Sequence, residues 1–162
     1  MNNAELREKL KTHIINAVSE SMEMFFVDAE HMGEYLDYSE GIDWINMDAL
    51  YAEILIFFPF SGELRLIMPR QLVVTMAENV YSMEEEPSEQ ILDDLIAETL
   101  NVIAGRLLAS MLPPSERFKF GLPELGEDSF LETDAFSEAV DFDAEGIPLW
   151  VVACGEGFLE YV

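Results

Sequence analysis

Apolar residues recur at helical spacing between Pro87 and Pro113, and this pattern predicts one long central helix. At roughly 100° per residue, six side chains fall on one stripe that must face the core: Leu92, Ile96, Leu100, Ile103, Leu107 and Met111. A similar stripe predicts an amphipathic helix from Ala4 to about Val27. A third helix is expected from Arg70 to about Met83.

Alternating apolar and polar residues predict strands on both sides of the central helix. Leu50 to Met68 is expected to form a hairpin that turns through residues 59–62, where proline, serine and glycine supply turn chemistry. Glu53 and Arg65 are expected to pair across this hairpin on its exposed face.

A second group of strands is predicted near the end of the chain. Arg117 to Leu122 is expected to be a single strand. Ala139 to Asp143 and Leu149 to Ala153 are expected to form a closing hairpin that turns at residues 144–146.

Three segments carry no regular pattern. Asp28 to Asp48 is expected to be an irregular connector with a short strand around Trp44 to Met47. Gly126 to Ala135 is expected to be an acidic loop, and the chain from Gly155 onward is expected to be a tail. Because the strands are clustered and linked as hairpins, the order of elements favours an α+β fold. We expect an antiparallel sheet with long helices on one face, forming a single domain over residues 1–162.

The formal net charge of -25 narrows the range of partners. Such a chain repels phosphate backbones and anionic lipids, so nucleic acid and membrane surfaces are not expected partners, whereas a basic patch on another protein is. The most apolar stretch, residues 50–68, is interrupted by charged residues, proline and glycine and is not expected to span a membrane. The lone cysteine, Cys154, is expected in the core, and this cysteine usage suits a cytoplasmic protein.

The central helix carries an unusual polar face. Asp94, Glu98, Asn101 and Gly105 follow one another at helical spacing opposite the apolar stripe. Asp94 and Glu98 are like charges four residues apart, asparagine is a mediocre helix former, and an interior glycine costs about 1 kcal/mol relative to alanine. From this stretch alone two interpretations stay open: an ordinary solvated face, or a carboxylate and an amide directed at a partner with Gly105 leaving room for it.

Other chemistry has little support in the sequence. There is no Glu-x-x-His spacing, no glycine-rich phosphate loop and no defensible Ser/His/Asp arrangement, so a metalloenzyme or carboxylate hydrolase is disfavoured. His13 has no second ligand at a useful offset and is expected to be a surface histidine, and His31 is assigned no role.

The first and central helices can be aligned with each other. Glu20-Ser21-Met22-Glu23 matches Glu98-Thr99-Leu100-Asn101 in character, which suggests two equivalent long helices. Glu23 stands where the central helix has Asn101, so if the amide performs chemistry, the first copy is inactive.

The polar face resembles the motif of the CheC/CheX chemotaxis phosphatases, and the CheX branch most closely. Asp94, Glu98, Asn101 and Gly105 complete the family spacing of an acidic residue or serine, a glutamate, an asparagine and a glycine. The preceding Gly62, Pro69 and Ala77 and the later Pro123 also resemble family positions. The resemblance covers roughly residues 4–153.

This resemblance implies a pseudo-duplicated fold and a phosphatase that stimulates dephosphorylation of the aspartyl phosphate on a CheY-like response regulator. Asn101 would position the attacking water, Glu98 would pair with the active-site lysine of the regulator, and Asp94 and Gly105 would serve docking. No cofactor is expected on this chain, with Mg²⁺ expected on the regulator. The alternative is a non-catalytic regulator-binding adaptor on the same fold.

The resemblance also implies a homodimer formed by strand addition at a sheet edge. The apolar alternation at residues 149–153 is compatible with such an edge.

Overall fold

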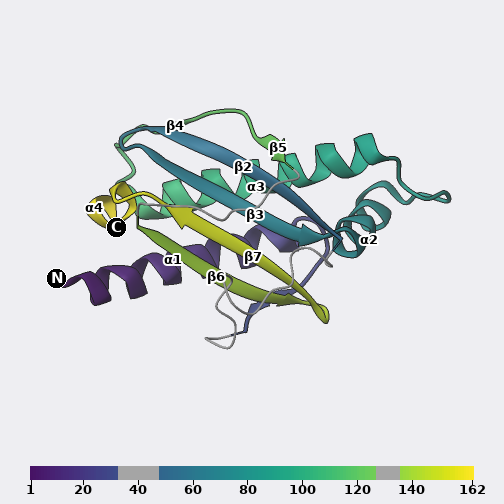
Figure 1. Ribbon diagram of the computed structural model, residues 1–162, viewed down its shortest axis with the longest axis horizontal. Coiled ribbons are helices and arrows are strands. Elements are labelled where there is room, and N and C mark those ends of the chain that lie inside the picture. The colour runs from purple at the N-terminus through teal and green to yellow at the C-terminus, as the bar shows by residue number, and fades with distance from the viewer. Residues whose placement is uncertain (33–47, 127–135) are drawn as a thin grey trace.

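One antiparallel sheet forms the framework of the protein, and two long helices, α1 (Asn3–Glu23) and α3 (Glu89–Met111), lie on one face of it (Figure 1). The computed structural model describes residues 1–32, 48–126 and 136–162. The expected α+β architecture is confirmed. The strand expected at residues 44–47 and most of the loop expected at residues 126–135 lie outside the described residues.

In the part of the chain that the structure describes, the sheet has seven strands and all the pairings are antiparallel. Six strands follow in spatial order: β1 (Ala29–His31), β6 (Ser137–Ala144), β7 (Ile147–Cys154), β3 (Gly62–Pro69), β2 (Ala49–Phe58) and β4 (Lys119–Phe120). β5 (Glu124–Gly126) also pairs with β2. Two shorter helices complete the fold: α2 (Arg70–Tyr81) and α4 (Gly157–Tyr161).

The order of the strands shows the expected duplication. Each half consists of a long helix, a short strand and a hairpin: α1, β1 and β2–β3, then α3, β4 and β6–β7. The hairpins meet where β3 pairs with β7, and the short strand of each half pairs with the hairpin of the other, β1 with β6 and β4 with β2. The halves are therefore interlocked.

Period-two alternation explains which side chains face the helices. The inward residues of β2 and β3 are fully or almost fully buried: Ala52, Ile54, Ile56, Leu64, Leu66 and Met68. In the closing hairpin, Glu145 and Gly146 both have positive φ (54° and 91°), as a two-residue turn between twisted strands requires. Both predicted hairpins are confirmed, and Cys154 is buried as expected.

The opposite face of the sheet differs from the expectation for Glu53 and Arg65. Their Cα atoms lie opposite each other, yet Arg65 Nη2 donates to Glu63 Oε2 at 2.9 Å, and Glu53 accepts from the Tyr51 hydroxyl at 2.7 Å. The expected pair of Glu53 and Arg65 is wrong, because the Arg65 guanidinium binds Glu63, which lies two residues away on the same face of β3. Burial raises the pKa of the nearby Cys154 thiol to about 11, so this cysteine stays protonated and packs as an apolar group.

The C-terminal segment is a docked helix, so the expectation of a tail is wrong. Phe158 of α4 is fully buried and meets Phe60 edge to face, with ring centroids 4.9 Å apart. A Cβ on Gly62 would lie 2.9 Å from the Phe158 ring, so glycine is required where β3 begins beneath it. The side chain that closes this end of the core therefore comes from the last residues of the chain.

Three strand expectations also need correction. The segment expected to be an irregular connector contains β1, and the strand expected at residues 117–122 is reduced to the two-residue β4, with the separate strand β5 following it. The alternation at residues 149–153 belongs to β7, which lies inside the sheet between β6 and β3 and is not an edge. A strand buried on both sides has the same apolar character as an edge that needs covering. None of the helices described is both long and apolar enough to cross a bilayer.

Removing the Phe158 ring tests the role of α4. Phe158→Ala is expected to lower the free energy of unfolding by about 3 kcal/mol, because it leaves a cavity against Phe60 and Gly62. Denaturant unfolding measures this, with the exposed Glu160→Ala as control. Equal stability of the two variants would show that the segment is the dispensable tail that the sequence suggested.

Candidate functional site

Helix α3 presents the candidate site, and its own sequence defines its ends. Ser88 caps the N-terminus, its Oγ accepting from the Ile91 N–H at 3.3 Å, and the helix ends just before Pro113. All six residues of the predicted stripe are buried. α1 packs alongside in the opposite direction, with His13 Nδ1 3.0 Å from Ser110 Oγ and Arg106 reaching Glu20.

The structure brings the four predicted site residues onto one outward ridge, which we call the motif ridge: Asp94, Glu98, Asn101 and Gly105. The first three are exposed, and Gly105 is half-buried. Asp94 accepts a hydrogen bond from Gln90 Nε2 at 2.8 Å. Within residues 1–32, 48–126 and 136–162, the side chains of Glu98 and Asn101 take part in no hydrogen bond or ion pair. Both side chains are available to a partner; their chemical roles stay predictions.

Gly105 has no packing reason to be glycine. A Cβ placed there would meet no atom within 4 Å, so alanine would fit. Alanine would also favour the helix by about 1 kcal/mol. In the free protein the glycine is therefore a cost with no compensating contact, as expected where another molecule approaches the helix closely.

The matching segment of α1 has the same local structure. Ser21 and Thr99 are both fully buried, and each donates its hydroxyl to the carbonyl four residues earlier, at 2.6 and 2.7 Å. Glu23 is exposed at the position equivalent to Asn101. Glu20, equivalent to Glu98, is not available in the same way, because Arg106 Nη1 binds its Oε2 at 3.1 Å. The two ridges are thus alike in backbone and different in chemistry.

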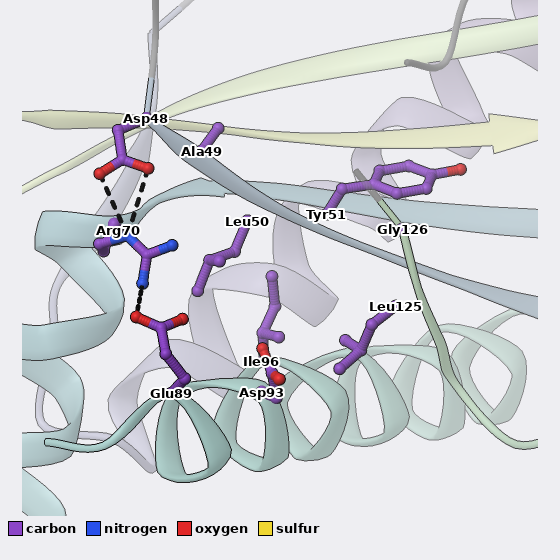
Figure 2. Close-up of a pocket in the computed structure, with 10 residues that line it drawn as sticks. All are labelled: Asp48, Ala49, Leu50, Tyr51, Arg70, Glu89, Asp93, Ile96, Leu125 and Gly126. Atoms are coloured by element: carbon purple, nitrogen blue, oxygen red, sulfur yellow. Dashed lines mark hydrogen bonds and ion pairs between the residues drawn. The ribbon is translucent and has the colours of Figure 1, made fainter. Parts of the chain in front are cut away.

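A pocket of about 450 Å³ lies on the flank of α3 that faces β2 and β5, between the sheet edge and the start of the helix (Figure 2). Figure 2 shows Arg70 between Asp48 and Glu89, bound to both. Arg70 Nε lies 3.1 Å from Asp48 Oδ2, and the Arg70 N–H donates to the Asp48 carbonyl at 2.8 Å. The hydrogen bond to Glu89, and next the one to Asp48, raise the pKa of Arg70. The same contacts connect α2 to α3 and to the residue that precedes β2.

The lining of this pocket combines apolar side chains with acidic ones. Its floor is apolar, with Leu50, Ile96 and Leu125, and its other charged groups are acidic. Arg70, the cation among its lining residues, already binds two carboxylates. The sequence does not reveal this cluster, because the pattern at Arg70 predicts only the start of a helix and no local pattern links it to residues 48 and 89.

No cluster of three or more potential metal ligands occurs in the part of the chain that the structure describes. The His13 side chain of α1 contacts Ser110 of α3. Burial, and next the positive charge of Lys9, lower the pKa of His13, so it is neutral near pH 7. The motif ridge itself offers an amide, which both donates and accepts, and carboxylates, which accept. It can hold a water molecule and bind a cation.

Residues 52–137, more than half of the chain, match the family described as chemotaxis phosphatase CheX. No curated protein matches the sequence significantly. The fold resembles the crystal structure of chemotaxis protein CheX from Desulfovibrio desulfuricans, with a TM-score of 0.72, 13% identity, and coverage of 90% of this chain and 98% of that chain.

Two further structures have the same fold. Chemotaxis protein CheX from Vibrio vulnificus matches with a TM-score of 0.72 and 10% identity, covering 90% of this chain and 98% of that chain. A chain of the CheX-CheY-BeF3-Mg²⁺ complex from Borrelia burgdorferi matches with a TM-score of 0.64 and 16% identity, covering 88% and 95%. At such low identity these likenesses show the fold alone.

Gly105→Ala tests whether the free protein gains anything from the glycine. We expect the free energy of unfolding to rise by about 0.5–1 kcal/mol, because helix propensity improves without a clash. Denaturant unfolding measures the change. The matched control is Gly62→Ala, which should destabilise because its Cβ would press on Phe158. A loss of stability in Gly105→Ala would contradict an unpacked ridge.

Proposed function

This chain belongs to the CheX family of chemotaxis phosphatases, and on that premise we propose that it accelerates dephosphorylation of the aspartyl phosphate on a CheY-like response regulator. The observation that carries the proposal is the motif ridge, where Glu98 and Asn101 stand one turn apart, exposed and without partners among the described residues. Both residues lie inside the range that matches the family.

Asn101 positions the attacking water in this proposal. Water attacks phosphorus, the bond to the aspartyl oxygen breaks, and the products are a free carboxylate, inorganic phosphate and a proton. An acyl phosphate is already labile, so holding the water in line supplies most of the gain. The Asn101 carbonyl oxygen accepts from the water, and its amide group steadies a neighbouring oxygen.

Glu98 fixes the position of the regulator. Its free carboxylate pairs with the active-site lysine of the regulator in a charge-assisted hydrogen bond. Asp94, one turn earlier and held by Gln90, contributes to docking, and Gly105 lets the partner approach the helix. This chain supplies no cofactor in the proposal: Mg²⁺ belongs to the regulator.

A non-catalytic adaptor is the second candidate. The net charge of -25 favours it, because added charge serves recognition more than hydrolysis. An adaptor binds the regulator through the same ridge and leaves the lifetime of its phosphate unchanged.

Asn101→Ala separates the two candidates. Every CheY-like receiver domain of the source organism is phosphorylated, and the decay of its phosphate is followed with and without the protein. The variant is expected to lose acceleration by on the order of a hundredfold or more, because water positioning is removed. Glu23→Ala is the matched control: it removes an exposed side chain at the equivalent position of α1 and should keep the activity.

Two outcomes would overturn the phosphatase proposal. In the first, wild-type protein binds a receiver domain but speeds the decay of none, which leaves the adaptor. In the second, Asn101→Ala and wild type accelerate decay equally.

We further propose that the protein is a homodimer and that the edge formed by β2, β4 and β5 makes the contact. Five large apolar side chains are exposed along it: Leu55, Phe57, Phe58, Leu122 and Leu125. Two of the eight cationic residues, Arg117 and Lys119, flank Phe57 and Phe58 around a pocket of about 680 Å³. They reduce the local repulsion between two acidic copies.

Phe57→Glu tests this edge. Wild type is expected to sediment with the mass of two chains and the variant with the mass of one, since a charge replaces an exposed apolar contact. The control is Tyr81→Glu, which also replaces an exposed large side chain with a charge but lies on α2. This variant should remain dimeric. A wild-type mass of one chain at high salt, where repulsion is screened, would rule out the dimer.

A further inference from the structure

Phe26 has an unusual combination of backbone and exposure. It adopts a left-handed conformation with φ of 59°, and its side chain is 70% exposed. The neighbouring Phe25 and Val27 are both buried. The chain therefore turns one aromatic ring outward between two apolar residues that face the core.

The local geometry is a Schellman motif in which glycine is the usual residue. The Phe26 N–H bonds the Glu23 carbonyl at 3.0 Å, and the Val27 N–H bonds the Met22 carbonyl at 3.1 Å, closing the end of α1. The left-handed residue of this motif is Phe26, and a bulky side chain is rare there. Among the described residues, neither the backbone conformation nor burial of the ring explains a phenylalanine at this position.

The residue that follows the motif ridge in the chain, Arg106, contacts this end of α1. Arg106, directly after Gly105, reaches across to α1: its Nη1 lies 3.1 Å from Glu20 Oε2 and its Nη2 3.3 Å from Met24 Sδ. Met24 is also exposed, at 52%. Asn79 Nδ2 donates to the Phe26 carbonyl at 3.4 Å, so α2 holds this turn from the other side.

We propose that Phe26, with Met24, is an apolar docking residue that contacts the response regulator when it binds the motif ridge. The inference rests on the proposed function and adds a binding contact to it. The occupant is an apolar patch on the regulator that borders its phosphorylation site. We assign this occupant because the apolar residues continue the surface of the motif ridge. Arg106, which follows Gly105, contacts Met24, and Met24 precedes the exposed ring of Phe26 by two residues.

The composition of the ridge explains why such a contact is needed. Asp94, Glu98 and Asn101 are polar, and exposed charge pairs contribute little to affinity. Protein interfaces obtain most of their binding free energy from a few buried aromatic or other large side chains. Phe26 and Met24 supply that area beside the ridge, and the outward backbone presents the ring before the partner arrives.

Phe26→Gly is the decisive variant, because glycine suits the left-handed position and removes only the ring. The probe is the phosphorylated receiver domain whose decay the wild-type protein accelerates most. We expect KM to rise about tenfold with kcat unchanged. The same loss is expected in Kd for that receiver loaded with BeF3⁻ and Mg²⁺. The midpoint of thermal unfolding should be equal to or higher than that of wild type.

Two variants make the comparison specific. Ser82→Gly places glycine at the left-handed residue that ends α2 (φ of 48°) and removes no ring. Its KM should therefore equal that of wild type. Phe26→Tyr keeps the ring and should restore KM to the wild-type value.

Each outcome decides the inference. KM and Kd of Phe26→Gly equal to those of wild type would overturn it and leave the phosphatase proposal intact, since that depends on Asn101. If no receiver loses its phosphate faster, the Kd comparison is made on the receiver that binds, and an unchanged Kd again overturns it. If the protein binds none, both proposals fail.

Discussion

The burial of two apolar helical stripes against one face of a single sheet governs this structure. Leu92, Ile96, Leu100 and Ile103 of α3 and their counterparts in α1 are buried above the inward residues of β2, β3, β6 and β7. Because a helix that buries one side must expose the other, the packing that stabilises the fold also turns the motif ridge to solvent. The candidate chemistry thus depends on the rigidity of the core beneath it.

Duplication provides two such ridges, and their side chains have diverged. Ser21 and Thr99 occupy the same buried position and make the same backbone hydrogen bond, so both helices keep the same local structure. On the exposed side, the α1 copy has Glu23 in place of the amide, and Arg106 engages Glu20. The end of α1 carries the two partners of Arg106, Glu20 and Met24, and the outward ring of Phe26.

The surfaces proposed for the two partners lie on different elements. The helical layer presents the motif ridge and the end of α1, whereas exposed apolar side chains such as Phe57 and Leu122 lie along the β2–β4–β5 edge. A regulator on the first surface and a second copy on the other need not compete. The negative charge acts on both, which makes ionic strength a common control.

The sequence by itself determined the features that repeat over short distances. Helical periodicity placed α3 to within two residues and put Asp94, Glu98, Asn101 and Gly105 on one exposed face; period-two alternation identified both hairpins. Only the tertiary structure decided that β7 lies inside the sheet, that Arg65 binds Glu63, that Phe158 closes the core, and that Arg70 joins Asp48 to Glu89. It also placed Arg106, the residue after Gly105, against Met24 at the end of α1. The reason is physical: periodicity reports which side of an element is apolar, whereas the neighbour it meets depends on contacts between residues far apart in the chain.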